Sequence, residues 1–195
     1  MKIKTKILLF TLLPTTVMLA ALQYFTLSYS ISESKKNSRI IMESVSKEYA
    51  NKIKAELEGA MDTARTLSQI FEGYEYLETN KRREEMTLQV KNVLAKNSHF
   101  FGMSTCWEPN ALDGLDSRYR NAPGHDSTGR FIPYWSNVEG KLTLEPLTGY
   151  DKSGEGDWYL IPKETGEEIV TEPYEYTVLG KKVYMITLSS PIKSK

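Results

Sequence analysis

Aromatic side chains and polar groups alternate at short intervals in the last third of the sequence. The stretch from 129 to 192 contains the segments GRFIPYW, GDWYLIPKETGE, EPYEY and VYMITLSSPI, separated by Gly and Pro turns. Trp and Tyr each offer a flat apolar face and one polar group, which suits the binding of a small polar molecule. We therefore predict that at least three of these side chains share a pocket. The candidate ligand-binding residues are Arg130, Tyr134, Trp135, Asp157, Trp158, Tyr159, Tyr174 and Tyr176.

The spacing of the aromatic residues indicates which of them can act together. Tyr174 and Tyr176 are two residues apart, so they share one face of a strand. Tyr134 and Trp135 are adjacent and point to opposite faces, so only one of them would line a given pocket. The alternative for each aromatic side chain is simple packing between a helix and a sheet.

Acidic residues gather in a polar segment from 110 to 128, but they do not form a metal-binding pattern. Asp113, Asp116 and Asp126 lack the alternate ligand positions and the terminal Glu of a calcium loop. We therefore expect them to be solvated turn residues. The segment itself is too long for a mere connection, which predicts a functional or ligand-covering loop.

The residues that most often carry catalysis are few and scattered. The two histidines, His99 and His125, have no Cys or second His at metal-ligand spacing. Ser127 follows His125 and Asp126 directly, and such sequence neighbours are not a triad. The single cysteine, Cys106, lies in the apolar segment FFGMSTCW and is expected to be a small buried hydrophobe. We predict no catalytic residue, no metal site, no cofactor and no enzyme activity.

The chain begins with a basic segment and a long apolar one. Lys2, Lys4 and Lys6 precede about 22 residues without a formal charge, from 7 to 28, which is enough to cross a hydrocarbon core as a helix. A cleaved signal peptide has a shorter apolar centre and a clearer cleavage site, so an uncleaved anchor is favoured. The positive-inside rule then places residue 30 onward outside the inner membrane. The balance of 25 basic and 25 acidic residues gives no reason to expect a nucleic-acid partner.

The periodicity of apolar residues predicts helices first and strands later. Apolar positions recur at steps of three and four from 41 to 71, which indicates one long amphipathic stalk helix leaving the membrane and suited to a homodimer. A second helix is expected from Lys81 to Lys96, and a short strand in FFGMSTCW. Later strands are expected over Arg130–Ser136, Lys141–Pro146, Thr171–Val178 and Lys182–Ser190, with a short helix at Asp157–Lys163 capped by Asp157. Together these elements predict an α+β domain with an antiparallel sheet.

The order of these features resembles the double Cache (dCache) sensor domain of bacterial methyl-accepting chemotaxis receptors, over most of the chain. The segments that carry the resemblance are GRFIPYW, GDWYLIP, EPYEY and TLSSPI. It implies a PAS-like membrane-distal module that binds amino acids, amines, carboxylates or purines outside the inner membrane. It also implies that the rest of the sheet, a second module, a second membrane helix and the output domain lie beyond Lys195, so that the module here is incomplete.

The amino-acid-binding members of this family have an Arg-x-Trp-Tyr signature followed by Tyr-x-Asp, in which the Arg holds the ligand carboxylate and the Asp its ammonium. Trp158, Tyr159 and Tyr174 match it, but Gly156 stands in the place of the Arg and Tyr176 in the place of the Asp. An aromatic wall near Asp157 suits an amine through cation–π attraction. The alternative is that Arg130 or Arg118 supplies a displaced anion clamp, which returns carboxylates to the list. The expected ligand is therefore an amine, an amino acid or a carboxylate.

The sequence therefore predicts four parts: a cytoplasmic tail (1–6), a transmembrane anchor (7–28), a periplasmic stalk helix (29–78) and a partial membrane-distal Cache module (79–195). The expected function is small-molecule sensing for a chemoreceptor. The same module also serves histidine kinases and diguanylate cyclases, so these outputs stay open. A membrane-anchored envelope enzyme and an anchored scaffold are the hypotheses from other classes.

Overall fold

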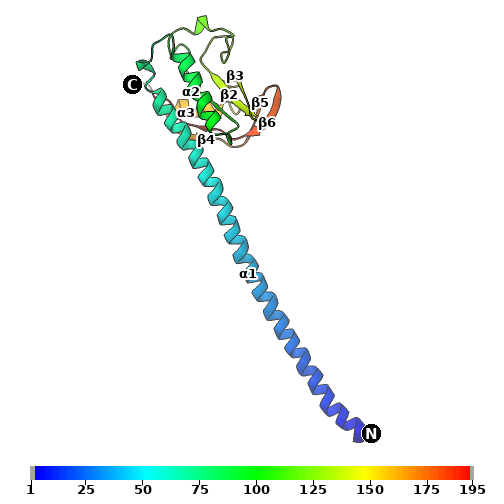
Figure 1. Cartoon of the computed structure of the whole chain (residues 1–195). Helices are drawn as coiled ribbons and strands as arrows, with labels where there is room; N and C mark the ends of the chain where they lie inside the picture. Colours follow the sequence, from blue (N-terminus) through cyan, green and yellow to red (C-terminus); the bar gives the residue numbers. More distant parts are fainter. Residues whose placement is uncertain (1–2, 194–195) are drawn as a thin grey trace. The chain divides into compact units, whose positions relative to one another are not determined.

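The computed structural model describes residues 3–193, and the chain divides into two compact units, Met1–Glu56 and Leu57–Lys195. The elements in chain order are α1 (Ile3–Phe71), η1 (Tyr74–Tyr76), α2 (Arg82–Lys96), β1 (Gly102–Ser104), η2 (Asp116–Arg118), β2 (Pro133–Val138), β3 (Lys141–Pro146), α3 (Asp157–Thr165), β4 (Ile169–Val170), β5 (Tyr174–Val178), β6 (Lys181–Met185) and β7 (Leu188–Ser189) (Figure 1). The expected α+β class, with a long helix before an antiparallel sheet domain, is confirmed.

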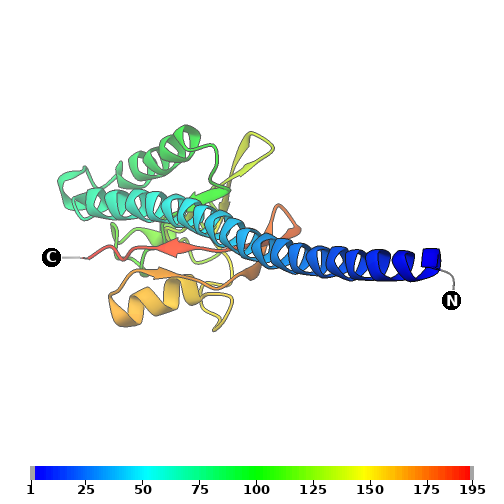
Figure 2. The same ribbon diagram turned by 90° about the horizontal axis from the view of Figure 1, so that it is seen from below.

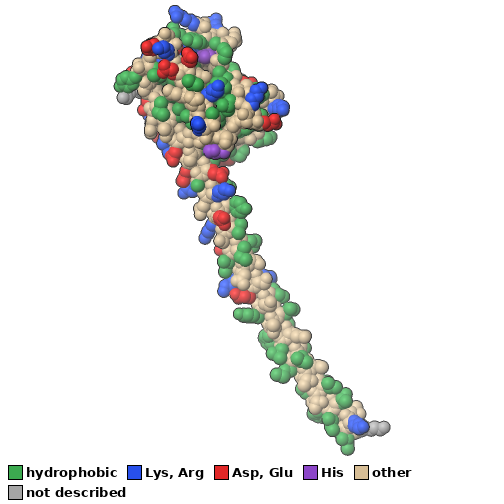
Figure 3. Space-filling view, in the orientation of Figure 1, with side chains coloured by type: hydrophobic (Ala, Val, Ile, Leu, Met, Phe, Trp, Pro, Cys, Tyr) green, Lys and Arg blue, Asp and Glu red, His purple; other side chains and the backbone are tan. Residues whose placement is uncertain are grey.

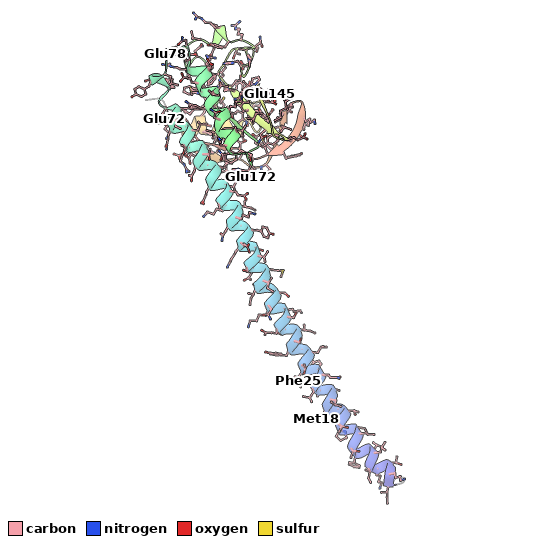
Figure 4. The ribbon with its side chains drawn as sticks, viewed as in Figure 1. Met18, Phe25, Glu72, Glu78, Glu145 and Glu172 are labelled. Atoms are coloured by element: carbon pink, nitrogen blue, oxygen red, sulfur yellow. The ribbon has the colours of Figure 1, made fainter. Side chains whose placement is uncertain are left out.

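The N-terminal unit is helical throughout its described residues. Its apolar part is long and hydrophobic enough to cross a membrane, with a mean hydropathy of 1.8 over the best window and none of that window buried. Uncharged side chains cover this part of α1 in the space-filling view (Figure 3). Met18 and Phe25 project outward from the ribbon (Figure 4). Such exposure of large apolar side chains fits a lipid environment rather than water.

In the C-terminal unit, the last turns of α1 and the helix α2 contribute to one core, and both are seen in Figure 2. Leu67 and Phe71 of α1 pack with Met86 and Val90 of α2 in one hydrophobic core. The spacing of four between the two residues on each helix gives each a single apolar stripe, which is why they pair. The expected second helix is confirmed within one residue.

The central sheet has three antiparallel strands in the order β1-β2-β3, so β2 is the middle strand. Alternate side chains of β2 serve two different cores. Trp135 packs against the core formed with α1 and α2, whereas Tyr134 belongs to a second core on the other side. The prediction that these two neighbours point to opposite faces is therefore confirmed. A two-residue turn with positive φ at Glu139 and Gly140 joins β2 to β3, as expected for a tight hairpin.

The last two expected strands have other limits in the structure. The strand expected over 171–178 begins only at Tyr174, as β5, with β4 ahead of the predicted range, and the one expected over 182–190 is divided into β6 and β7. β4 pairs with β7, and β5 pairs with β6, in separate two-stranded sheets. Pro173 lies between β4 and β5 and has no N–H to donate to a ladder, so pairing is interrupted there. The tight turn at Leu179 and Gly180, both with positive φ, joins β5 to β6.

The helix α3 begins after Gly156, which is its N-cap, so the prediction that Asp157 caps it is wrong. Asp157 is instead the first helical residue. Its carboxylate accepts a hydrogen bond from the backbone N–H of Gly154 at 2.8 Å, within the preceding turn. Gly166 ends the helix in the left-handed conformation at φ 68°.

The long loop before β2 is held from the inside by Arg83 of α2. Its guanidinium bonds the carboxylates of Asp113 and Asp116, at distances between 2.6 and 2.7 Å, and the carbonyl of Gly129 at 2.8 Å. The prediction of solvated turn residues is thus wrong for Asp113 and Asp116. The buried Arg83, which lies 30 and 33 residues earlier in the sequence, requires both carboxylates as partners, and local spacing does not reveal it. Asp126 is half-buried and accepts hydrogen bonds from Thr128 and Tyr150.

Candidate functional site

Five of the eight predicted site residues meet in the second core. We call this group the aromatic cluster: Tyr134 from β2, Trp158 and Tyr159 from α3, and Tyr174 and Tyr176 from β5. The rings of Tyr134 and Tyr176 lie edge to face with centroids 5.9 Å apart, and those of Tyr174 and Tyr176 are 6.2 Å apart. The alternation of β5 places its two tyrosines on one face, as the spacing predicted.

Two polar atoms in the aromatic cluster are buried without a hydrogen-bond partner among the described residues. They are the hydroxyl of Tyr134 and the indole Nε1 of Trp158, on side chains of residues only 7% and 6% exposed. A buried polar group without a partner costs about 1–3 kcal/mol, so such atoms are rare in native proteins. A core packed only for stability would have Phe or Leu at these positions. The two atoms therefore distinguish the aromatic cluster from a purely apolar core.

The other two tyrosine hydroxyls from β5 are already satisfied. Tyr176 accepts a hydrogen bond from the backbone N–H of Thr148 at 2.9 Å, and the hydroxyl of Tyr174 lies 2.7 Å from that of Thr187. Burial raises the pKa of both phenols, so both stay neutral. The hydroxyl groups of these two tyrosines are thus engaged within the domain.

Acidic side chains that no sequence pattern marked border the aromatic cluster. Glu155 lies close enough to raise the pKa of Tyr174 and Tyr176, after the larger effect of burial. Glu145 acts in the same direction on Tyr134 and Tyr176, and its carboxylate accepts the N–H of Leu179 at 3.2 Å. Glu145 projects from β3 beside the β5–β6 hairpin (Figure 4). No sequence motif distinguishes these two glutamates from the other acidic residues of the surface.

Arg130 lies next to the cluster but is already engaged. Its buried guanidinium donates to the carbonyl of Trp107 and the hydroxyl of Tyr159, and it stacks over the rings of Tyr150 and Tyr159 at 4.7 and 4.9 Å. These contacts join the start of β2 to α3. They hold the guanidinium in place from several sides, which is typical of a positioning role.

Cys106 packs against the aromatic cluster, and burial raises the pKa of its thiol to about 12. Its thiol therefore stays protonated at neutral pH. The side chain is half-buried and behaves as a small hydrophobe, in agreement with the prediction.

Two predicted site residues lie elsewhere. Trp135 faces α2, where its indole donates to the carbonyl of Thr87 at 3.1 Å and the ammonium of Lys91 lies 5.0 Å from its ring. Asp157 is bonded within its own turn, and Arg118 is exposed at the end of η2.

The structure gives a physical reason for the glycine in the signature motif. Gly156 is buried, and a Cβ atom there would lie 2.5 Å from the carbonyl oxygen of Gly149 and 2.7 Å from the backbone of Tyr150. An arginine at this position requires the backbone to move. The carboxylate clamp of the amino-acid-binding signature is therefore incompatible with the backbone of this chain.

An open pocket of about 390 Å³ lies away from the aromatic cluster, between η1 and the long loop. Arg82 borders it and donates to the carbonyl oxygens of Leu77, Glu75 and Leu112. The Arg82 guanidinium already donates to these carbonyl oxygens. It therefore gives weaker support for a ligand in this pocket than the two unpartnered atoms give for one at the aromatic cluster.

Comparisons with known proteins agree with this geometry. Residues 86–195 match the model of the methyl-accepting chemotaxis protein-like, first PDC sensor domain family. Methyl-accepting chemotaxis protein TlpQ of Pseudomonas aeruginosa is 32% identical over 130 residues, which are 60% of this chain and 18% of that protein. This chain thus spans less than a fifth of the length of that relative.

Solved structures show the same fold. The extracellular domain of a protein described as a histidine kinase, mmHK1S-Z3, is 39% identical with a TM-score of 0.67, over 76% of this chain and 51% of that one. A structure named methyl-accepting chemotaxis protein X has a TM-score of 0.65 at 24% identity, over 76% of this chain and 54% of that one, and supports the fold alone.

Proposed function

Because the chain belongs to the methyl-accepting chemotaxis protein-like, first PDC sensor domain family, we propose that it is the extracytoplasmic sensing part of a transmembrane chemoreceptor. The family match covers more than half of the chain, and it includes the whole aromatic cluster. The similarity to the extracellular domain of a histidine kinase makes a kinase output the alternative for the complete receptor.

The ligand of this sensor binds at the aromatic cluster. The observation that carries this assignment is the pair of unpartnered buried atoms, the hydroxyl of Tyr134 and Nε1 of Trp158. An indole N–H can only donate, so the ligand offers a hydrogen-bond acceptor at this point. The hydroxyl of Tyr134 can donate or accept and therefore tolerates either kind of group.

The ligand is a small amine that also carries an acceptor atom, as in an amino acid with a non-α amine. A cation is attracted by the faces of Tyr174 and Tyr176 and by the negative charge of Glu155. A simple α-amino acid is less suitable, because the arginine that would hold its carboxylate cannot be placed at Gly156. Carboxylates without an amine are the remaining alternative.

Titration calorimetry on the full chain in lipid nanodiscs tests this function. Three four-carbon probes separate the contributions of the groups: butylamine has the amine, butyrate the carboxylate and 4-aminobutyrate both. We expect the probe with both groups to bind most tightly, and Trp158→Phe to weaken it at least tenfold by removing the donor. Exclusive binding of butyrate would replace the amine proposal by a carboxylate site. Probe affinities unaffected by Trp158→Phe would remove the aromatic cluster as the site.

The same proposal places the apolar part of α1 in the inner membrane, with the sensor unit outside it. Residues 7–28 span the membrane and the preceding lysines stay in the cytoplasm. Reaction of the native thiol is avoided in a Cys106→Ser background, in which cysteines placed at exposed surface positions can be labelled with an impermeant maleimide. Labelling of Lys152→Cys in intact cells supports this topology, and labelling only after lysis contradicts it.

The sensor is a homodimer through α1. Val45 and Ile53 belong to an apolar stripe that is exposed in the single chain. In the Cys106→Ser background, we expect Val45→Cys and Ile53→Cys to form disulfide-linked dimers under mild oxidation. Lys47→Cys lies on the opposite side of the helix and is the matched control. Equal crosslinking at all three positions would argue against a defined helix pair.

A further inference from the structure

A chain of contacts leads from the aromatic cluster to the last turns of α1. Trp158 and Tyr159 belong to α3, and α3 packs against β4 and β7. In Figure 2, α3 lies beside these strands. Glu168 immediately precedes β4, and Ser190 immediately follows β7, so both lie at the end of the pair that α3 covers.

Glu168 and Ser190 are the residues by which this strand pair holds α1. Arg65 donates from Nε and Nη2 to the two carboxylate oxygens of Glu168, both at 2.7 Å, across 103 residues of sequence. The hydroxyls of Ser68 and Ser190 lie 3.1 Å apart one turn further along the helix, and Ser190 also donates to Glu168 at 3.3 Å. The paired geometry fixes direction as well as distance.

This contact differs in kind from the core that holds α1 on the domain. The buried residues Leu67 and Phe71 pack without directional bonds. The side chains of Arg65 and Glu168 are 44% and 30% exposed, so water can replace the partners of the ion pair when it opens. A directional contact at a partly exposed position can be broken and remade without opening the core, which suits an element with two arrangements.

We propose that the Arg65–Glu168 pair, together with the Ser68–Ser190 contact, couples the position of α3 to that of α1 and so transmits the state of the aromatic cluster to the stalk helix. This inference rests on the proposed sensing function, because it assigns the contacts through which ligand binding at that site changes the position of α1. Ligand that binds at Trp158 displaces α3, the strand pair follows, and the forked bond carries the displacement to Arg65.

A mutant cycle tests the coupling without any ligand. The full chain in nanodiscs is compared as wild type, Trp158→Phe, Glu168→Gln and the double variant, and deuterium uptake is measured over residues 57–71. We expect Trp158→Phe to change uptake there at least twofold in the wild-type background, and by a smaller factor or not at all when Glu168→Gln is present. Tyr159→Phe serves as a second perturbation of α3 if Trp158→Phe lowers the yield of folded protein.

Two further variants distinguish coupling from a general loss of surface charge. Arg65→Gln removes the other partner and should abolish the effect as Glu168→Gln does. Glu175→Gln breaks an ion pair with Lys182 on the β5–β6 hairpin, also at 2.7 Å and also exposed, and should leave the effect intact. An unchanged response to Trp158→Phe in the Glu168→Gln background overturns the coupling, as does the absence of any response in the wild type. Neither result depends on the calorimetric titrations, so the two proposals fail separately.

Discussion

Arg83 and Asp113 form a forked ion pair in which both hydrogen bonds are direct: Nε to Oδ2 at 2.7 Å and Nη2 to Oδ1 at 2.6 Å. The two side chains are 4% and 1% exposed. Arg83 stands on α2 and Asp113 in the long loop, so the pair attaches an irregular segment to a helix from within the domain. A buried charge retained in this way is costly to leave without its partner.

The first prediction follows from that cost. Asp113→Ala leaves Arg83 with one carboxylate fewer in a buried site, and we expect the free energy of unfolding to fall by about 3 kcal/mol or more. Urea denaturation of the full chain in detergent, followed by tryptophan fluorescence, measures the change. The control Lys152→Ala breaks an exposed pair with Glu155 and should cost at most about 1 kcal/mol. Equal losses of unfolding free energy in the two variants would mean that the buried pair contributes no more to stability than the exposed one.

Acid should weaken the same pair. Burial alone raises the pKa of Asp113, but its hydrogen bonds from Arg83 and the N–H of Leu115 outweigh burial and hold the pKa below its ordinary value. A carboxyl group whose pKa is lower in the folded state stabilises the fold above its unfolded pKa of about 3.9, and this contribution is lost as the pH falls through the folded value. We expect the unfolding midpoint of wild type to drop between pH 5 and about pH 3. Asp113→Asn should show a shallower drop, and an identical slope would exclude this group as the cause.

Space for the Tyr134 ring depends on Gly102 in the neighbouring strand. A Cβ atom at position 102 would lie 2.5 Å from the hydroxyl of Tyr134 and 2.6 Å from its ring. We expect Gly102→Ala to displace this ring, to lower the free energy of unfolding by about 1–3 kcal/mol and to weaken probe binding. Gly59→Ala is the matched control, because nothing lies within 4 Å of its added Cβ and helix propensity should raise stability by about 0.5–1 kcal/mol. Both are measured by thermal denaturation.

The two tyrosines whose rings touch should respond oppositely to removal of their hydroxyls. Tyr134→Phe deletes a buried hydroxyl without a partner in the described chain, so we expect it to raise stability by about 1 kcal/mol while it weakens binding. Tyr176→Phe deletes a hydroxyl that accepts the N–H of Thr148, so it should lower stability by about 1 kcal/mol. Calorimetric unfolding of both variants decides this. A loss of stability in Tyr134→Phe would indicate that its hydroxyl is satisfied.

Local patterns in the sequence were sufficient for most of the elements. The steps of three and four around Leu67 predicted the helix, and the hairpin turns at Gly140 and Gly180 predicted two strand pairs correctly. The alternation of Tyr174 and Tyr176 predicted a shared face. These features depend on neighbours a few residues apart, which sequence periodicity records directly.

Features that depend on distant partners could not be predicted in the same way. Asp113 and Asp116 have the composition of an exposed loop, and only the approach of Arg83 explains their burial. Glu155 borders the aromatic cluster because of how the preceding turn folds back, not because of a motif. The boundary at Pro173 was visible in the sequence, since proline cannot donate in a ladder, and the expected strand should have begun after it, at Tyr174.

The two faces of the middle strand β2 belong to different cores. The face that carries Trp135 is bound to α2, so changes there affect whether the domain folds. The face that carries Tyr134 has a polar group without a partner among the described residues, so under the proposed function changes there affect what the domain recognises. Because alternate residues of one strand carry the two tasks, descendants of this sequence can acquire a new chemical preference through substitutions on one face while the scaffold is inherited unchanged through the other.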